Sequence, residues 1–478
     1  MRTIELKNAV ARKPEWCLAE PVNFWLDEGE HIAIVGRNGG GKSMLVDMIT
    51  GRHPVAPGVI SYSFDEPYKN LKYIAFRDSY GGENDRTYFL QQRWNQMEID
   101  EETPTVGSKL EESFLLSGDD TPERRAFQQK LYSLFHLDTL LDKYIILLSS
   151  GELRKYKLAS SLFSQPKVLI IEDPFIGLDA ETREQVKELL QTLVNEHNMQ
   201  LILVLSKIDE IPSFVTRVLR LDGLRFVSDI KVKTEFPIER CPLALEVKKN
   251  NPIPPIPQEV IRFNHVTISY GERTILKDLN WVVLKGEHWA LSGQNGAGKS
   301  TLLSLVCADN PQSYACDISL FGRKRGSGES IWEIKKHIGY VSPEMHRSYK
   351  QNLPAIQIVA SGFKDTIGLY YRPTQEEKEL CIEWMNLFGI KHLADRRFLE
   401  MSSGEQRLVL LARAFVKSPD LLILDEPLHG LDLCNRNLVK TIVDRYMYEN
   451  PERTLIYVTH YENELPNCID NSLYLLRH

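Results

Sequence analysis

Residues 36–43 read GRNGGGKS, and residues 293–300 read GQNGAGKS, 257 positions later (293 − 36). Both fit the pattern G-x-x-x-x-G-K-[ST], in which backbone N–H groups of a glycine-rich loop converge on phosphates at the start of a helix. An apolar run precedes each loop (IAIVG, WALSG), and a run with helical spacing follows it (SMLVDMI, TLLSLVC). The sequence therefore predicts two phosphate-binding loops, each between a strand and a helix.

The similarity between the halves extends well beyond these loops. Residues 148–179, LSSGELRKYKLASSLFSQPKVLIIEDPFIGLD, recur at 401–432 as MSSGEQRLVLLARAFVKSPDLLILDEPLHGLD. The offset of 253 (401 − 148) is close to that of the loops, so one whole domain occurs twice. The runs KVLIIED and DLLILDE predict buried parallel strands, and mainly helical stretches are expected at about 88–148 and 351–400. Each half is thus expected to be an α/β domain.

We expect the first domain at 1–227, a linker at 228–258 and the second domain at 259–478. Residues 247–258 at the end of the linker read VKKNNPIPPIPQ, where four prolines in six residues favour an extended, semi-rigid spacer. Such a spacer allows the two domains to pair within one chain.

Composition limits the classes of function. The chain has 478 residues and a net charge of −7, which argues against a large surface for nucleic-acid backbones. It has no apolar stretch of about 18 residues that would span a membrane, and its first residues lack the apolar region of a signal peptide. We expect a cytoplasmic protein, with at most peripheral contact to the cytosolic face of the inner membrane.

The second half supplies further groups for nucleotide chemistry. Asp425 and Glu426 end a predicted strand, where the first carboxylate is suited to Mg²⁺ and the second to polarising the attacking water. His460 ends the next strand and could hydrogen-bond the γ-phosphate, whereas Tyr270 could stack on the adenine. Lys299 would reach the β- and γ-phosphates, and Ser300 would hold Mg²⁺.

The LSSGE and MSSGE segments, each followed by a strand that ends in two acids, resemble the signatures of ATP-binding-cassette (ABC) ATPases. The resemblance covers nearly the whole chain and implies, for each half, a mainly parallel P-loop sheet with an antiparallel β region and a helical subdomain. It also implies hydrolysis of ATP, with Mg²⁺ as cofactor, between the P-loop of one cassette and the signature of the other. Asp179 and Asp432 match the loop that links the two sites in that family.

The resemblance assigns the site residues as follows. The catalytic residues are Glu426, His460, Lys299 and Asp173. The ATP-binding residues are Gly36, Asn38, Gly39, Gly40, Gly41, Lys42, Ser43, Gly293, Asn295, Gly296, Ala297, Gly298, Lys299, Ser300, Thr301, Tyr270, Ser149, Ser150, Gly151, Glu152, Ser402, Ser403, Gly404 and Glu405. The metal ligands are Ser43, Glu172, Ser300 and Asp425.

The first half departs from the family pattern. Its acid pair is inverted to Glu172-Asp173, Ser206 stands in place of the histidine, and Lys13 aligns with Tyr270. Aspartate is one methylene shorter than glutamate, and a displacement of ~1 Å can cost about 100-fold in rate. We therefore expect the Lys42 site to bind ATP but to hydrolyse it slowly.

Neither half has the family's glutamine after its third strand. Asp78 and Pro343 stand at that position, and Gln91 and Gln92 are possible substitutes in the first half. How hydrolysis couples to a partner is therefore open.

Residues 321–342, FGRKRGSGESIWEIKKHIGYVS, resemble tandem-cassette ABC ATPases associated with molybdate uptake, the ModF or PhrA type. The basic run of residues 323–325 can also be interpreted without this resemblance, as an ordinary solvated hairpin loop. Three functions stay open: an ATPase that energises integral-membrane permease subunits, a factor that acts on ribosomes or nucleic acid, and a slow regulatory switch. The proline-rich linker and the negative charge argue against the ribosomal factor.

Overall fold

The computed structural model describes residues 1–56, 59–75, 103–148, 150–175, 180–197, 199–206, 210–231, 256–270, 273–294 and 296–476. The chain divides into two compact units, one from each half of the sequence, and each unit is described by itself. The predicted tandem α/β architecture is confirmed. The domain limits at 227 and 259 stay predictions, because linker residues 232–255 lie outside the described part.

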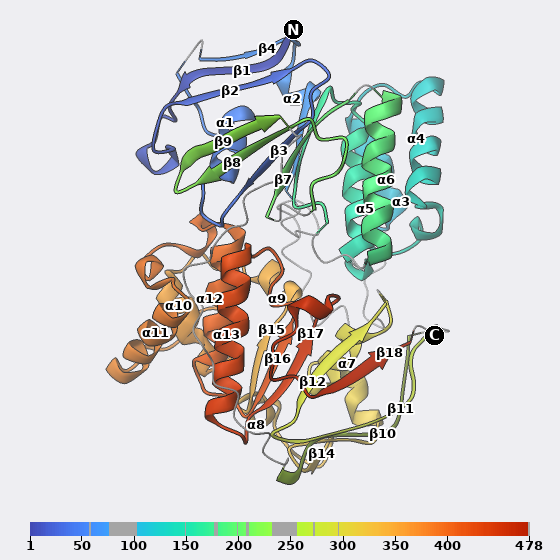
Figure 1. Cartoon of the computed structure of the whole chain (residues 1–478). Coiled ribbons are helices and arrows are strands. Elements are labelled where there is room, and N and C mark those ends of the chain that lie inside the picture. Colours follow the sequence, from blue (N-terminus) through green and yellow to red (C-terminus); the bar gives the residue numbers. More distant parts are fainter. Residues whose placement is uncertain are drawn as a thin grey trace. The chain divides into compact units, whose positions relative to one another are not determined.

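The described residues of the first cassette form two sheets (Figure 1). Its elements are β1 (Arg2–Ala9), β2 (Val22–Asp27), β3 (Ile32–Gly36), α1 (Lys42–Ile49), β4 (Ile60–Tyr62), α2 (Pro67–Asn70), β5 (Leu71–Ala75), α3 (Val106–Leu116), α4 (Pro122–Phe135), α5 (Ser150–Leu162), β6 (Val168–Glu172), α6 (Ala180–His197), β7 (Gln200–Leu205), β8 (Arg217–Asp222) and β9 (Arg225–Lys231). The main sheet has the order β5-β6-β7-β3-β8-β9 and is parallel except for β9. The second sheet, β2-β1-β4, is antiparallel.

The second cassette repeats this plan. Its elements are β10 (Ile256–Tyr270), β11 (Arg273–Lys285), β12 (His288–Gly293), α7 (Lys299–Val306), β13 (Ile318–Leu320), β14 (Arg323–Lys324), α8 (Ile331–Lys335), β15 (Ile338–Val341), α9 (Pro343–Ser348), α10 (Ala355–Ala360), α11 (Gln375–Leu387), α12 (Ser403–Phe415), β16 (Leu421–Asp425), α13 (Leu433–Glu449), β17 (Thr454–Val458) and β18 (Asn471–Leu475). Its parallel sheet has the order β15-β16-β17-β12-β18, and its antiparallel sheet has the order β11-β10-β13-β14. The P-loop strand β3 lies between β7 and β8, and the P-loop strand β12 lies between β17 and β18, so the two strands have equivalent places in their sheets.

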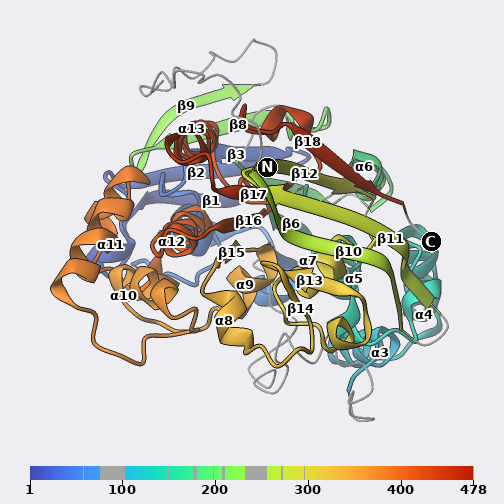
Figure 2. The same cartoon turned by 90° about the horizontal axis from the view of Figure 1, so that it is seen from below.

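The uninterrupted apolar strands are explained by two cores, one on each face of the parallel sheet. Along β16, Leu422 and Leu424 pack with the helices α10 to α13, whereas Leu421 and Ile423 pack with β10, β11 and α7. Figure 2 shows the β10–β11 hairpin and the helices α10 to α12 on opposite sides of β12 and β17. Because both faces of the strand are buried, no polar residue alternates with the apolar ones.

The helical regions correspond in part to the predicted stretches. Helices α3 and α4 fall within 88–148, and α10 and α11 fall within 351–400. Residues 88–102 of the first stretch lie outside the described residues. Over the part of the chain that the structure describes, no helix combines the length and the hydropathy needed to cross a bilayer.

Candidate functional site

The two P-loops have the same local geometry. Helix α1 begins at Lys42 and α7 begins at Lys299, so both loops lead directly into the first turn of a helix. Lys42 Nζ donates to the carbonyl oxygen of Gly36 at 2.7 Å, and Lys299 Nζ donates to that of Gly293 at 2.7 Å. Each ammonium group is therefore held over its own loop, close to the N-terminal end of a helix, where anions bind favourably.

The glycine before each lysine is required by the backbone. Gly41 and Gly298 have φ angles of 99° and 94°, in the left-handed region that favours glycine. A Cβ atom on Gly41 would lie 2.4 Å from Leu18 Cδ2, and one on Gly298 would lie 2.9 Å from Ile275 Cγ2. Asn295 of the second loop lies outside the described residues. Glycine therefore allows each loop to take this left-handed turn directly before the helix that begins at the lysine.

The first acid of each pair lies beside the P-loop helix or its lysine. Ser43 Oγ donates to Glu172 Oε1 at 3.1 Å, and the Tyr73 hydroxyl donates to Glu172 Oε2 at 2.6 Å. In the second cassette, burial raises the pKa of Asp425 well above its ordinary value, with Glu344 and Glu426 adding to the effect and Lys299 opposing it. A serine hydroxyl and a carboxylate thus meet at one point in the first cassette, and they are hard oxygen donors suited to Mg²⁺.

The second acid of each pair has an unusual backbone conformation. Asp173 has φ 47° and Glu426 has φ 46°, both left-handed for residues other than glycine. The Asp173 amide donates to the carbonyl of Val204 at 2.7 Å, and the Glu426 amide donates to that of Val458 at 2.9 Å. Strained backbone of this kind concentrates at functional sites.

The side chains around this second acid differ between the cassettes. Asp173 Oδ1 accepts hydrogen bonds from the backbone amide and the hydroxyl of Ser206, each at 3.0 Å. Burial, with the neighbouring Glu172 charge, raises the pKa of Asp173 to about 7, although Lys42 and Ser206 oppose the shift. At neutral pH, this carboxyl group is therefore partly protonated, and its Oδ1 atom is occupied by the two hydrogen bonds from Ser206.

Glu426 is instead surrounded by imidazoles. Its Oε1 lies 3.3 Å from His460 Nε2, and its Oε2 lies 3.6 Å from His429 Nδ1. Burial alone would raise the pKa of Glu426, but the hydrogen bond with His460 and the charges of His429 and Lys299 hold it well below its ordinary value. Glu426 is thus held as an ionised carboxylate at neutral pH.

The signature segments form helix starts. In the second cassette, Ser402 caps α12: the Glu405 amide donates to Ser402 Oγ at 3.3 Å, and the Ser402 amide donates to Glu405 Oε2 at 2.8 Å. Ser403 and Gly404 form the first turn of this helix. In the first cassette, α5 begins at Ser150 and continues through Gly151, and Glu152 pairs with Lys143 at 2.7 Å, whereas Ser149 lies outside the described residues.

Other predicted positions are only partly visible. Asp432 caps α13, because its Oδ1 accepts from the Asn435 amide at 2.8 Å. Pro343 is the first residue of α9. The remaining positions of this kind, Asp78, Gln91, Gln92 and Asp179, lie outside the described residues.

Two buried arginines of the signature helices were not predicted. Arg154 NH1 donates to the carbonyl of Pro174 at 2.9 Å, and Arg407 donates to the carbonyls of Ser342 at 3.1 Å and Glu426 at 3.0 Å. Both side chains are almost fully buried. They occupy the same position after SSGE, so the repeat itself held the signal. Each arginine ties its signature helix to the backbone of its own cassette, at the second acid for Arg407 and at the next residue for Arg154.

An aromatic residue of the first cassette was also missed. Trp16 stacks on His53 with ring centroids 4.3 Å apart, and His53 follows Lys42 by eleven residues. In the second cassette, Asn310 follows Lys299 by eleven residues and donates to the Tyr270 hydroxyl at 3.0 Å. The first cassette therefore has an aromatic ring at the corresponding place. The alignment of Lys13 with Tyr270 missed it because Trp16 lies three residues further along the chain.

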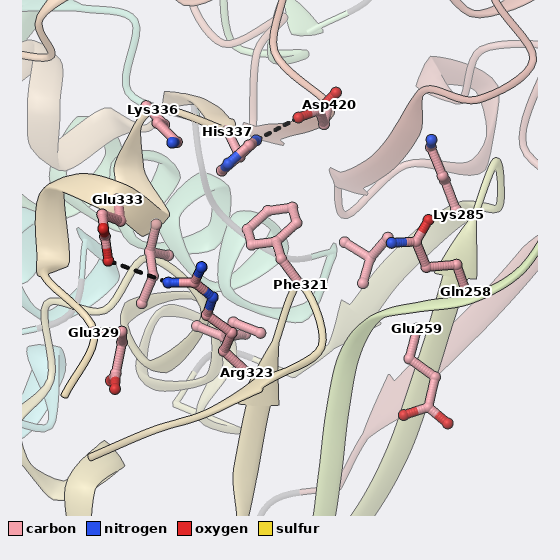
Figure 3. Close-up of a pocket in the computed structure, with 13 residues that line it drawn as sticks. Gln258, Glu259, Lys285, Phe321, Arg323, Glu329, Glu333, Lys336, His337 and Asp420 are labelled. Atoms are coloured by element: carbon pink, nitrogen blue, oxygen red, sulfur yellow. Dashed lines mark hydrogen bonds and ion pairs between the residues drawn. The ribbon is translucent and has the colours of Figure 1, made fainter. Parts of the chain in front are cut away.

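A pocket of about 310 Å³ lies elsewhere in the second cassette (Figure 3). Lys285, His337 and Asp420 line it, and each precedes the amino end of a parallel strand, β12, β15 or β16. Asp425 and the P-loop lie at the carboxyl ends of β16 and β12, so the pocket is at the opposite edge of the sheet from the nucleotide chemistry. Figure 3 shows His337 directed at Asp420 beside the ring of Phe321.

The basic run next to this pocket is only partly solvated. Arg323 and Lys324 are exposed, as a hairpin loop predicts, but Arg325 is buried. Arg325 pairs with the buried Glu329, whose Oε1 also accepts from the Gly326 amide at 2.9 Å. The interpretation of a wholly solvated loop is therefore wrong for Arg325.

Comparisons with known proteins are consistent with this geometry. The family model described as "ABC transporter" matches residues 19–176 and 276–429. The ABC transporter ATP-binding protein ModF of Escherichia coli is 37% identical over 463 residues, which cover 94% of this chain and 91% of that protein. An uncharacterised ABC transporter ATP-binding protein of Schizosaccharomyces pombe is 30% identical over 488 residues, which cover 99% of this chain and 97% of that protein.

Among solved structures, an archaeal ribosome recycling factor in complex with a ribosomal stalk protein resembles this chain with a TM-score of 0.54. The match covers 98% of this chain and 87% of that chain at 17% sequence identity, so it shows the fold alone.

The raised pKa of Asp173 predicts a pH-dependent effect of Asp173→Asn on the stability of the nucleotide-free protein. Below about pH 4 the carboxyl group is protonated in both the folded and unfolded chain. Between about pH 4 and 7 only the unfolded chain loses the proton, so the wild-type protein becomes less stable as the pH rises. Relative to wild type, the Asn variant should gain about 2–3 kcal/mol of unfolding free energy between about pH 5 and 8.

Urea unfolding at several pH values measures this difference. A difference that stays constant across the range would show that Asp173 titrates with an ordinary pKa.

Proposed function

The chain belongs to the ABC transporter family and is an ATP-binding protein with two cassettes, and we propose that it hydrolyses ATP at its second P-loop to drive a membrane permease. The observation that carries the proposal is the environment of Glu426. An ionised carboxylate between two histidines follows a strand that lies two places from the P-loop strand in the same sheet. This arrangement is suited to activating a water molecule for attack on a γ-phosphate.

We propose that Lys299 binds the β- and γ-phosphates and that Glu426 takes a proton from the attacking water, with His460 orienting the carboxylate. The backbone of residues 293–298 and residues Ser300 and Thr301 would hold the remaining phosphate oxygens. Tyr270 offers a ring for the adenine.

Mg²⁺ is expected to accompany the nucleotide. Ser300 and Asp425 in the second cassette, and Ser43 and Glu172 in the first, are the proposed ligands. No cluster of three His, Cys, Asp or Glu residues suited to a metal occurs in the described part of the chain. Two protein oxygens per site fit Mg²⁺, which is commonly bound by one or two protein oxygens together with phosphate and water. When bound, Mg²⁺ supplies positive charge to the phosphate oxygens.

We propose that the first P-loop binds ATP and hydrolyses it slowly. Gly36, Gly41 and Lys42 provide the same phosphate loop as in the second cassette. Asp173, however, is one methylene shorter than Glu426, and its carboxyl group is hydrogen-bonded to Ser206. The family arrangement further suggests that each nucleotide lies between the P-loop of one cassette and the signature of the other, within one chain.

A membrane permease is the proposed partner. The chain covers nearly the whole length of ModF, a protein named as an ABC transporter ATP-binding protein, and this supports a transport role. The same likeness, together with residues 321–342, makes molybdate the first solute to test. Action on the ribosome is the second candidate, because the fold resembles that of an archaeal ribosome recycling factor over nearly the whole chain.

The asymmetry predicts unequal effects of two matched substitutions. Glu426→Gln should lower steady-state phosphate release at least ~100-fold, because removing a positioned general base typically costs about 10²–10⁴-fold. Asp173→Asn should retain at least about half of the activity, because the slow site that contains this acid contributes little to the total rate of phosphate release. A colorimetric phosphate assay on the purified chain measures both, and nucleotide binding by each variant is the control. If Asp173→Asn is the inactive variant, the proposed assignment of fast and slow sites is wrong.

Trapping with the Glu426→Gln chain should identify the partner. In the presence of ATP and Mg²⁺ this variant is expected to stay nucleotide-bound and to retain its partner during purification from its own host. We expect integral-membrane subunits in stoichiometric amount from solubilised membranes, detected by mass spectrometry. The Lys42→Ala/Lys299→Ala chain is the control that should lose them. Recovery of ribosomes instead, with no membrane subunit, would support the second candidate.

A further inference from the structure

The imidazole of His429 is the second one beside Glu426. We draw from it an inference that goes beyond the proposed ATPase activity and depends on that activity. The side chains of His429 and Glu426 are 12% and 19% exposed, so their contact is largely shielded from water. His460 faces Oε1 at 3.3 Å and His429 faces Oε2 at 3.6 Å, so each carboxylate oxygen has an imidazole nitrogen beside it.

The backbone fixes His429 in this place. The His429 amide donates to the carbonyl of Glu426 at 3.1 Å, and the Leu431 amide donates to that of Leu428 at 3.1 Å. Gly430 then takes a φ of 75°, which ends the two successive turns. Since His429 is tied to the backbone of Glu426 itself, a movement of this turn carries the acid and the imidazole together.

The first cassette has neither imidazole in its sequence. Ser206 stands at the position of His460, and Ile176 stands at that of His429, three residues after Asp173. The acid that we propose to be active therefore has two histidine neighbours, and the acid that we propose to be slow has none at the matching positions.

We propose that His429 is a positioning residue that holds the Oε2 side of the Glu426 carboxylate through its Nδ1 atom. Without it, the carboxylate has only the contact of Oε1 with His460, and the whole group can tilt about that one contact. Small displacements of a catalytic group are costly, on the order of 100-fold for about 1 Å. His429 therefore acts on the rate of the chemical step and leaves nucleotide binding unchanged.

Three substitutions test this role. His429→Ile introduces the residue of the first cassette and removes the nitrogen. His429→Asn retains a donor nitrogen at the same number of bonds from Cα as Nδ1, whereas His429→Gln places its nitrogen one bond further out. We expect kcat to fall at least ~10-fold in the Ile and Gln variants and to recover to within about 3-fold of wild type in the Asn variant. KM for ATP should stay within about 2-fold in all three.

Steady-state phosphate release, binding of a fluorescent ATP analogue and thermal unfolding are measured on the full-length chain. A wild-type kcat in His429→Ile, or equal losses in the Ile and Asn variants, would overturn the positioning role. If His429→Ile does not fold, the comparison of Asn with Gln decides the question. Glu426→Gln is assayed in parallel: if it is as active as wild type, the proposed function itself fails, whereas an inactive Glu426→Gln with an unaffected His429→Ile rejects only the role of His429.

Discussion

Backbone hydrogen bonding between parallel strands places the functional groups of each cassette. In the second cassette, Asp425 lies opposite Val458 in the sheet, and Val458 lies opposite Leu291 of the P-loop strand. Because parallel strands end at the same edge, the P-loop, the acid pair and His460 converge there. The first cassette keeps the same register, with Glu172 opposite Val204. The two sites therefore differ in their side chains and not in the register of the sheet.

Much of this arrangement could be predicted from the sequence. The phosphate loops, the buried strands and the repeat are local or periodic signals, and the loop glycines occupy the left-handed conformations that such loops need. The inverted acid pair was also visible as residue order, and the structure adds its physical consequence: Asp173 turns to Ser206 and has a raised pKa.

The features that sequence reasoning missed depend on contacts between distant segments. Arg407 reaches the carbonyl of Ser342, 65 residues away, and Trp16 stacks on His53, which lies beyond β2, β3 and α1 in the chain. No periodicity encodes such pairs, because the partners are chosen by the fold and not by their spacing.

The two hydrogen bonds of Arg407 have a mechanical consequence. One guanidinium group joins helix α12 to the end of β15, at Ser342, and to the turn that carries Glu426. Three segments that are separate in the chain thus share one rigid, planar connector, and a rotation of the signature helix displaces the carbonyls of both other segments. Arg407 thus couples the orientation of helix α12 to the position of the Glu426 backbone, which carries the acid that we propose as the general base.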